Sequence, residues 1–318
     1  MRKRETAGDS NVTSEKDAGP ARRWPKPEAS NICTIVVTFN PDVTLHARLR
    51  SLTKEVARLV VVDNDSDAKS RDMLESIARE PKAQVVYNNE NLGLAHALNQ
   101  GLALAHEAEL PWLLALDQDT TPLQNMVDSL TAAYDACPFR QEVAVVGSRF
   151  GAALKQPISQ GIPFTEEAVV ITAGSLLAVD AALAVGGFRE DFFIDFVDIE
   201  LCLRLRHAGL RVIRSSAPTI QHEVGQPRSH RLLSREVTAT HHNALRRYYI
   251  TRNRVIVWRE YLGRERSFIL SDMRRFAKEL VKLVCFEEDR TRKLLQLARG
   301  LADGLTGSTR AHGDFRRV

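Results

Sequence analysis

The chain changes character at Ile32, where the stretch ICTIVVTFNP (Ile32–Pro41) begins. Its first eight residues are apolar or β-branched, which is typical of a buried strand, and Asn40-Pro41 ends that strand because proline cannot donate to a sheet ladder. Similar strand-like runs follow at Leu59–Val62, Gln84–Tyr87 and Trp112–Leu116. We therefore predict four strands of one sheet.

Helix-like segments separate these runs, at Leu45–Leu52, Ser70–Arg79 and Gly93–His106. Strands that alternate with helices of this length form a parallel, doubly wound sheet with right-handed crossovers. The predicted fold class is therefore α/β, with a mostly parallel sheet and flanking helices.

Polar side chains stand where three of the predicted strands end. The clusters are Thr38-Phe39-Asn40, Asp63-Asn64-Asp65 and Asp117-Gln118-Asp119. Open α/β sheets bind ligands at the carboxyl edge of their strands, so this edge is the predicted ligand site. The competing interpretation of each cluster taken alone is that Asn and Asp simply begin turns.

Asp117 and Asp119 are two carboxylates one residue apart at the end of a strand. Oxygen ligands with this spacing suit Mg²⁺ or Mn²⁺ and leave positions for diphosphate oxygens. Asp63 ends a neighbouring strand, where it can accept hydrogen bonds from a base imide or a ribose hydroxyl. No G-x-G-x-x-G or G-x-x-x-x-G-K-[ST] occurs at the required place, which argues against dinucleotide redox chemistry and P-loop hydrolysis.

A second acidic cluster, Asp195, Asp198 and Glu200, precedes an apolar-periodic helix. Acids there suit the helix N-terminus, and one of them can pair with Arg204 or Arg206; this structural interpretation accounts for one of the three. Carboxyls among aromatic and aliphatic neighbours have raised pKa values, which suits a general base.

His222 follows the apolar-leaning stretch Ala217–Ile220. It can add an imidazole ligand to the carboxylate metal site, or it can be a structural histidine. Both interpretations stay open on the sequence.

Charge divides the chain unevenly. The net charge of the 318 residues is +4, but the segment from Arg246 onward has 18 Lys and Arg against 9 Asp and Glu, which leaves residues 1–245 at −5. We predict a disordered leader at residues 1–30, where twelve charges accompany almost nothing large and apolar. A catalytic domain at 31–245 and a basic helical C-terminal extension at 246–318 follow.

The extension contains a predicted amphipathic helix with a cationic face. Such a helix either covers the catalytic domain or contacts an anionic membrane peripherally. Its apolar positions are Leu270, Phe276, Leu280, Leu283 and Val284, beside Arg274, Arg275, Lys278 and Lys282.

The remaining features favour a cytoplasmic protein. The four cysteines form no C-x-x-C pair, and the basic start at Met1–Arg4 is followed by polar residues rather than by an apolar signal segment. The most apolar stretch, Val169–Phe188, contains Asp180 and is predicted to be buried core.

Several motifs in order along the chain together resemble the family 2 glycosyltransferases with a GT-A fold, and closely their rhamnosyltransferase subgroup. The resemblance extends from about Ile32 to Trp258. The motifs are Thr38-Phe39-Asn40-Pro41, Val61-Val62-Asp63-Asn64, Asn91-Leu92-Gly93 with Ala97-Leu98-Asn99, Asp117-Gln118-Asp119, Thr172-Ala173-Gly174-Ser175, Phe193–Glu200 and Tyr248–Asn253.

The resemblance implies an inverting, metal-dependent transferase that extends a bacterial surface polysaccharide from a dTDP-sugar donor, dTDP-L-rhamnose. The acceptor would be a saccharide or a lipid-linked saccharide, the cofactor Mg²⁺ or Mn²⁺, and the location the cytoplasm or the inner face of its membrane. No nucleic acid is implied, because no recognition motif is present.

The resemblance also implies residue roles. Thr38, Asn40, Asn91 and Gly93 belong to the nucleotide-sugar site, where Asp63 contacts the base and Asp117 the ribose and diphosphate. Asp119 binds the metal together with Asp117 and His222. Asp198 is the catalytic base, and Thr172, Gly174, Ser175 and Asp195 approach the acceptor. Ala173 departs from the subgroup, which often has Ser there, so the acceptor contact stays open.

Two other functions remain on the sequence. A metal-dependent nucleotidyltransferase also uses carboxylates on a doubly wound sheet, but it normally needs a Gly-rich basic loop after the first strand, where this chain has Asn40-Pro41-Asp42-Val43. A non-catalytic nucleotide-sugar-binding scaffold would keep the acids without turnover.

Overall fold

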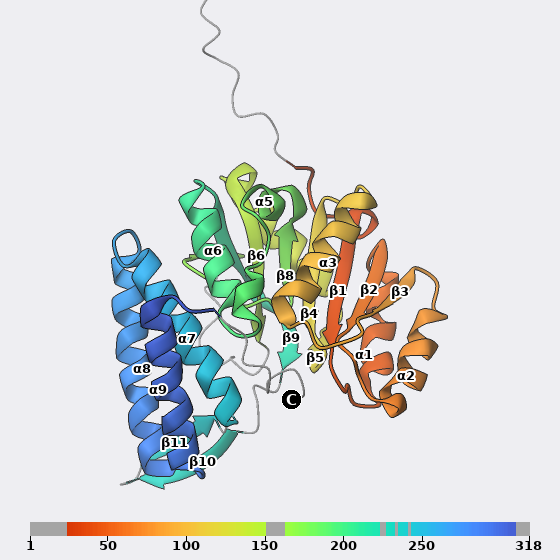
Figure 1. Cartoon of the computed structure of the whole chain (residues 1–318). Coiled ribbons are helices and arrows are strands. Elements are labelled where there is room, and N and C mark those ends of the chain that lie inside the picture. The colour runs from red at the N-terminus through yellow and green to blue at the C-terminus, as the bar shows by residue number, and fades with distance from the viewer. Residues whose placement is uncertain (1–23, 151–162, 223–226, 233–234, 241–242, 310–318) are drawn as a thin grey trace, which may run out of the picture.

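The structure is a computed structural model. It describes residues 24–150, 163–222, 227–232, 235–240 and 243–309, and the account of 222–240 is confined to the backbone. Residues 1–23 of the predicted leader lie outside the described residues. A nine-stranded sheet forms the centre of the described part, with helices on both of its faces (Figure 1).

Four parallel strands make one half of this sheet, in the order β3-β2-β1-β4. Most of their residues are buried, since helices cover a doubly wound sheet on both faces. The predicted alternation is confirmed, with ends that differ by one or two residues. The elements are β1 (Ile32–Thr38), α1 (Leu45–Arg50), β2 (Arg58–Asp63), α2 (Ala68–Ala78), β3 (Ala83–Tyr87), α3 (Leu94–Glu107) and β4 (Trp112–Asp117).

The other half of the sheet is mixed. Strand β8 runs antiparallel to β4 and to β6, and β6 in turn pairs in parallel with β9, whose other partners β5 and β7 are antiparallel. Its elements are β5 (Thr120–Pro122), α4 (Met126–Asp135), β6 (Val143–Phe150), β7 (Phe164–Glu167), β8 (Ser175–Ala178), α5 (Val179–Ala184), α6 (Val197–His207) and β9 (Arg211–His222). Short 3-10 helices cover Ala29–Asn31, Leu52–Lys54, Arg140–Glu142 and Glu190–Phe192.

Trp24 anchors the start of the described chain to the sheet. It is buried, its Nε1 donates to the carbonyl of Val143 at 3.1 Å, and its ring meets Trp112 edge-on. The composition of residues 1–30 did not predict this docking, because a single tryptophan that satisfies its N–H can bury a large apolar area by itself.

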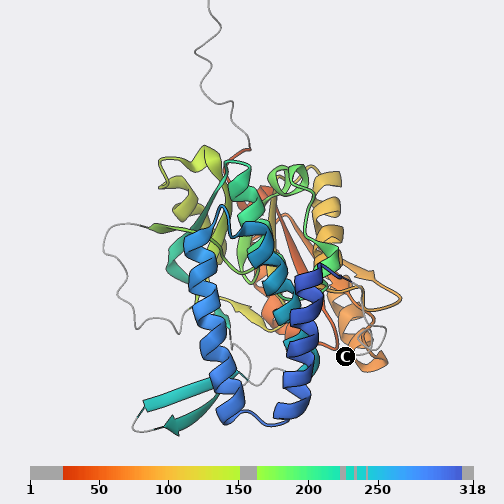
Figure 2. The ribbon, with the colours of Figure 1, turned by 60° about the vertical axis from the view of Figure 1, so that its left-hand side comes forward.

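The C-terminal part is a layer of three helices beside the sheet, α7 (Ala244–Tyr261), α8 (Arg266–Phe286) and α9 (Arg290–Thr306). Helix α7 lies between the sheet-bearing part and the other two (Figure 1). A hairpin of β10 (Pro227–Leu232) and β11 (Arg235–Thr240) precedes α7 and was not predicted (Figure 2).

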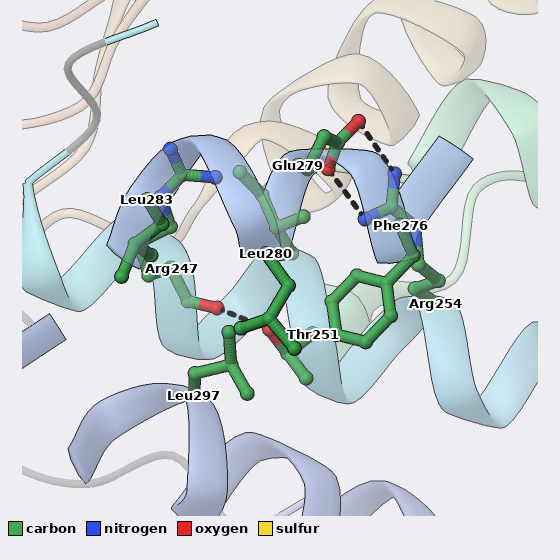
Figure 3. A pocket seen from close by; sticks show the side chains of 9 residues that line it. Arg247, Thr251, Arg254, Phe276, Glu279, Leu280, Leu283 and Leu297 are labelled. Atoms are coloured by element: carbon green, nitrogen blue, oxygen red, sulfur yellow. Dashed lines mark hydrogen bonds and ion pairs between the residues drawn. The ribbon is translucent and has the colours of Figure 1, made fainter. Parts of the chain in front are cut away.

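Buried charges join the three helices. Arg254 of α7 pairs with Glu279 of α8 at 2.8 Å and with Asp272 at 3.0 Å. Lys293 of α9 pairs with Glu287 at 2.8 Å. Figure 3 shows Arg254 and Glu279 at a small pocket between the helices, beside the apolar side chains of α8 that point toward α7.

The apolar residues of α8 therefore divide into two groups. Leu283 is buried, and Phe276 and Leu280 are half-buried in the contact with α7, which itself belongs to the extension. Leu270 and Val284 are exposed. No helix in the described residues is long and apolar enough to cross a membrane.

Candidate active site

The carboxyl ends of the parallel strands bring three predicted residues together. Thr38 pairs with Asp63 in the sheet, and Val37 pairs with Asp117. Asp63 is fully buried, Asp117 is half-buried and Asp119 is exposed. The carboxylates thus stand at one edge of the sheet, where the order of strands and helices predicted them.

Asp63 organises the turn after β2. Its Oδ1 accepts from Thr38 Oγ1 at 2.9 Å, and its Oδ2 accepts from the backbone N–H of Ser66 at 3.0 Å. Asn40, whose φ is 48°, accepts from the backbone N–H of Asp67 at 2.9 Å. Three residues of the predicted nucleotide-sugar site therefore form one hydrogen-bonded unit that joins the ends of β1 and β2.

Gln118 joins the Asp117–Asp119 segment to the end of β1. Its side-chain amide accepts from the backbone N–H of Phe39 at 2.8 Å and donates to the carbonyl of Phe39 at 3.2 Å. Arg48 of α1 donates to the carbonyl of Gln118 at 2.6 Å. The sequence analysis gave neither Gln118 nor Arg48 a role, because neither the residue type nor the spacing shows which backbone groups the side chain meets.

Negative charge is concentrated around Asp117. Its pKa is raised to about 7, first by burial and then by the nearby carboxylates of Asp119 and Asp198, against the opposing charge of Arg246. A divalent cation offsets such repulsion, and hard cations prefer carboxylate oxygens.

The chemistry of Asp117 and Asp119 fits two oxygen ligands of a divalent cation. The third predicted ligand, His222, is placed by its backbone, which pairs with Thr120, the residue after Asp119. Its side chain lies outside the described part. Among the described side chains, no group of three or more His, Cys, Asp or Glu converges as a preformed metal site.

The second acidic cluster starts on a loop with an unusual backbone. Phe193, Asp195 and Phe196 have φ values of 63°, 63° and 66°, which non-glycine residues rarely adopt. Asp195 forms an ion pair with Arg246 of α7 at 3.0 Å. Arg246 was not predicted as a site residue. It is the first residue of the segment in which positive charge is in excess.

Asp198 lies in the first turn of α6. Its Oδ1 accepts from the backbone N–H of Ile199 at 2.8 Å, and its Oδ2 accepts from the backbone N–H of Thr172 at 3.2 Å. Burial raises the pKa of Asp198, and the charge of Asp195 adds to this, while the two N–H bonds oppose it. The carboxylate thus lies near Asp117 and directly beside the predicted acceptor segment.

Glu200 has a structural role. It is buried, pairs with Arg204 at 2.6 Å and accepts from the hydroxyl of Tyr261 at 2.8 Å. The predicted ion pair therefore accounts for this one acid of the three, and the hydrogen bond from Tyr261 ties α6 to α7.

The predicted acceptor segment is a tight turn before β8. The N–H of Gly174 donates to the carbonyl of Ala115 at 2.8 Å, and the N–H of Ser175 donates to the carbonyl of Thr172 at 2.9 Å. Gly174 has φ 76°, and a Cβ there would lie 2.4 Å from Ser148 Oγ. Ala173, which stands where the subgroup often has Ser, is buried and faces the core.

Asn91 and Gly93 hold the start of α3 against the acidic loop. Asn91 Oδ1 accepts from the N–H of Gly93 at 3.0 Å, and the next N–H, that of Leu94, donates to the carbonyl of Phe193 at 2.6 Å. A Cβ at Gly93, whose φ is 89°, would lie 2.7 Å from that same carbonyl oxygen. In the structure these two residues therefore position the loop.

The sequence was compared with models of known protein families. The family model described as "Glycosyl transferase family 2" matches residues 33–175. A Shigella flexneri protein described as dTDP-rhamnosyl transferase RfbF is 26% identical over 249 residues, which cover 73% of this chain and 81% of that protein. Residues 33–175 of the chain therefore resemble a family 2 glycosyltransferase domain. The resemblance found in the sequence is thereby confirmed.

Solved structures show the same fold. S. aureus TarS 1–349 in complex with UDP-GlcNAc has a TM-score of 0.59 at 15% identity, over 87% of this chain and 81% of that one. GalNAc-T7 with UDP, GalNAc and Mn²⁺ has a TM-score of 0.55 at 11% identity, over 89% of this chain and 57% of that one. At these identities the likeness establishes the GT-A fold and nothing finer.

The family match ends at Ser175, before the second acidic cluster. Asp195, Asp198 and the residues of α7 that meet them therefore lie outside it. Their place in the site is given by the structure, which brings them to the edge formed by the matched strands.

Proposed function

We propose that this protein is a family 2 glycosyltransferase that transfers L-rhamnose from dTDP-L-rhamnose to a saccharide or lipid-linked saccharide, with inversion at the anomeric carbon. The donor is supported by the 26% identity to a protein described as a dTDP-rhamnosyl transferase. The observation that carries the chemistry is Asp198, a half-buried carboxylate with a raised pKa that is hydrogen-bonded to the proposed acceptor segment and lies near Asp117.

In the proposed reaction Asp198 takes the proton of the acceptor hydroxyl. The acceptor oxygen forms a bond to the anomeric carbon, and the bond from that carbon to the diphosphate oxygen breaks, so dTDP leaves with the bonding electrons. A single displacement without a covalent enzyme intermediate inverts the configuration. Thr172, Gly174, Ser175 and Asp195 would line the acceptor side of this reaction.

Asp117, Asp119 and His222 would hold the divalent cation. When bound, Mg²⁺ or Mn²⁺ supplies positive charge to the diphosphate. Thr38, Asn40, Asp63, Asn91 and Gly93 would shape the nucleotide-sugar side, where Asp63 keeps the β2 turn in place. The cationic Arg246 lies near the same carboxylates, so it is well placed to balance the charge of the bound diphosphate.

We also propose peripheral contact of the extension with an anionic membrane at the cytoplasmic face, beyond the catalytic domain of residues 31–245. Seven of the eleven large hydrophobic side chains that are exposed in the described residues lie between Leu262 and Leu305. Leu270, Val281 and Val284 recur along α8 at helical spacing, beside the exposed cations Arg274 and Lys278. Apolar side chains framed by cations match an anionic lipid surface.

A donor panel tests the proposed activity. Release of nucleotide diphosphate is measured for dTDP-rhamnose and other nucleotide sugars with Mg²⁺ or Mn²⁺, with and without a rhamnose-terminated acceptor, and NMR of the product gives the anomeric configuration. Acceptor-dependent release from dTDP-rhamnose supports the proposal. Binding of the donor without release would instead indicate a scaffold, and release of pyrophosphate from a triphosphate a nucleotidyltransferase.

A further inference from the structure

Side chains of helix α7 donate hydrogen bonds to several backbone carbonyls of the acidic loop, residues 191–195. Asn253 is fully buried, and its Nδ2 lies 3.0 Å from the carbonyl oxygen of Phe192, 2.9 Å from that of Ile194 and 2.9 Å from that of Asp195. A side-chain amide has two N–H donors, so the three carbonyls share them. One side chain thus satisfies three acceptors on four consecutive loop residues.

Two neighbours of Asn253 on α7 also contact the loop. Arg252 donates through Nη2 to the carbonyl of Asp191 at 2.6 Å, and its Nε donates to Asn253 Oδ1 at 2.9 Å, which fixes the orientation of the amide. Tyr249 stacks on the ring of Phe193 with centroids 5.2 Å apart. Tyr249, Arg252 and Asn253, which we call the α7 latch, therefore act on the loop as one unit.

The loop needs such partners because its backbone is strained. Phe193, Asp195 and Phe196 all have positive φ, a conformation that persists only where surrounding contacts over-determine it. The start of α3 holds the carbonyl of Phe193, and Arg246 pairs with Asp195. The latch adds its contacts from the C-terminal side of the loop.

The strained residues directly precede the proposed catalytic base. Phe196 is the N-cap of α6, Val197 follows it, and Asp198 is the second residue of the helix. A change in the loop therefore tilts the start of α6 and moves the carboxylate relative to Thr172. A shift of about 1 Å in a reacting group can reduce the rate about 100-fold.

We propose that Asn253 is a positioning residue for the transfer reaction: its amide holds residues 192–195 in the conformation that places Asp198 at the acceptor. This inference rests on the proposed function for its kinetic consequence, and on the loop geometry alone for its structural one. Asn253 contacts neither donor nor acceptor in this assignment, so its loss acts on turnover more than on binding of the donor.

The test compares Asn253→Asp with the wild type. Asp keeps the shape of the side chain and the acceptor for Arg252, but it removes both N–H donors. We expect kcat to fall about 10- to 100-fold while the KM for the donor stays close to that of the wild type. Hydrogen–deuterium exchange should become faster in residues 190–198 and stay unchanged in the strands of the sheet.

Arg259→Ala is the matched control, because Arg259 lies on the same helix and donates to the carbonyl of Gly304 rather than to the loop. The proposal is overturned if Asn253→Asp leaves both exchange in 190–198 and kcat unchanged, or if Arg259→Ala produces the same two effects. If the wild type transfers no sugar, the proposed function fails, whereas faster exchange confined to 190–198 still establishes the structural role of Asn253.

Discussion

Asp198 and Asp195 lie three residues apart and are held by different partners. Two backbone N–H groups hold Asp198, whereas a guanidinium holds Asp195. We expect Asp198→Asn to reduce kcat about 100-fold or more, the usual scale for a positioned base, because the amide cannot accept the acceptor proton. Steady-state kinetics and donor titration together check that turnover falls while donor binding persists.

Asp195→Asn is the comparison for this prediction. It leaves the shape of the loop residue intact and weakens the pair with Arg246, so transfer should continue at a reduced rate. If the Asp195→Asn enzyme were inactive and the Asp198→Asn enzyme active, the base would be Asp195 and not Asp198.

The raised pKa of Asp198 gives the transfer rate a pH dependence. A base works only when deprotonated, so kcat/KM should fall as the pH drops through the pKa of Asp198. Because burial raises this pKa, the fall should begin at a higher pH than for an ordinary aspartate. The profile of kcat/KM at saturating metal measures it, and the residual activity of Asp198→Asn should lack the same limb.

Asp119 offers an exposed carboxylate next to the crowded Asp117. We expect Asp119→Ala to abolish transfer, since it removes an oxygen ligand from the proposed cation. The wild type should lose activity in EDTA and regain it with Mg²⁺ or Mn²⁺. Activity that survives both EDTA and the substitution would remove the metal from the proposal.

The residues that end strands were predictable, and the residues that brace them were not. Asp63, Asp117 and Asp119 follow runs of buried strand residues, so their common edge follows from the alternation of strands and helices. Gln118 and Asn253 act through backbone atoms of segments 79 and about 60 residues away, and no local pattern records such partners. Only the tertiary structure shows them.

At the scale of elements, the contact of α9 with α7 depends on two glycines one turn apart. A Cβ at Gly300 would lie 2.5 Å from the carbonyl oxygen of Tyr248, and one at Gly304 would lie 2.8 Å from that of Arg252. We expect Gly304→Ala to destabilise the protein by about 1–3 kcal/mol, as overpacking usually does, despite the better helix propensity of alanine. Chemical denaturation measures the free energy of unfolding.

Gly263→Ala is the control for this prediction. A Cβ at Gly263, between α7 and α8, meets nothing within 4 Å, so the same change of side chain should leave the stability almost unchanged. Equal effects of the two substitutions would show that α9 tolerates a wider separation from α7 than the structure has.

The elements themselves were predictable to different degrees. The four parallel strands are apolar runs flanked by amphipathic helices, so their existence was predictable, whereas their order in the sheet comes from the structure. Strands β5 and β7 are three and four residues long, and they join the sheet through β9, far along the chain. Such short strands acquire their conformation from their partner, which a local pattern does not contain.

At the scale of the whole molecule, the extension offers cations and exposed apolar side chains on α8. Each Lys or Arg near an anionic surface contributes about 1 kcal/mol to membrane binding. We expect the full chain to co-sediment with anionic liposomes, less at high salt and less with neutral lipid. The double substitution Val281→Glu/Val284→Glu should weaken this binding.

Leu183→Glu on α5 is the control for the liposome measurement, since Leu183 is also exposed but lies on the catalytic domain. If the α8 substitutions leave liposome binding unchanged, α8 does not contact the membrane and the extension only packs against the rest of the protein. Binding lost equally in the control would indicate a general effect of added negative charge.

The contact between α7 and the acidic loop also has a consequence for the order of events during synthesis of the chain. Ile194 and Asn253 are 59 residues apart in the chain. At about 5–20 residues per second, a ribosome adds the second roughly 3–12 seconds after the first. Through that interval the nascent protein has the strand ends and their carboxylates, but only the start of α3 supports the strained loop. The proposed sugar transfer therefore begins only after α7 has been made.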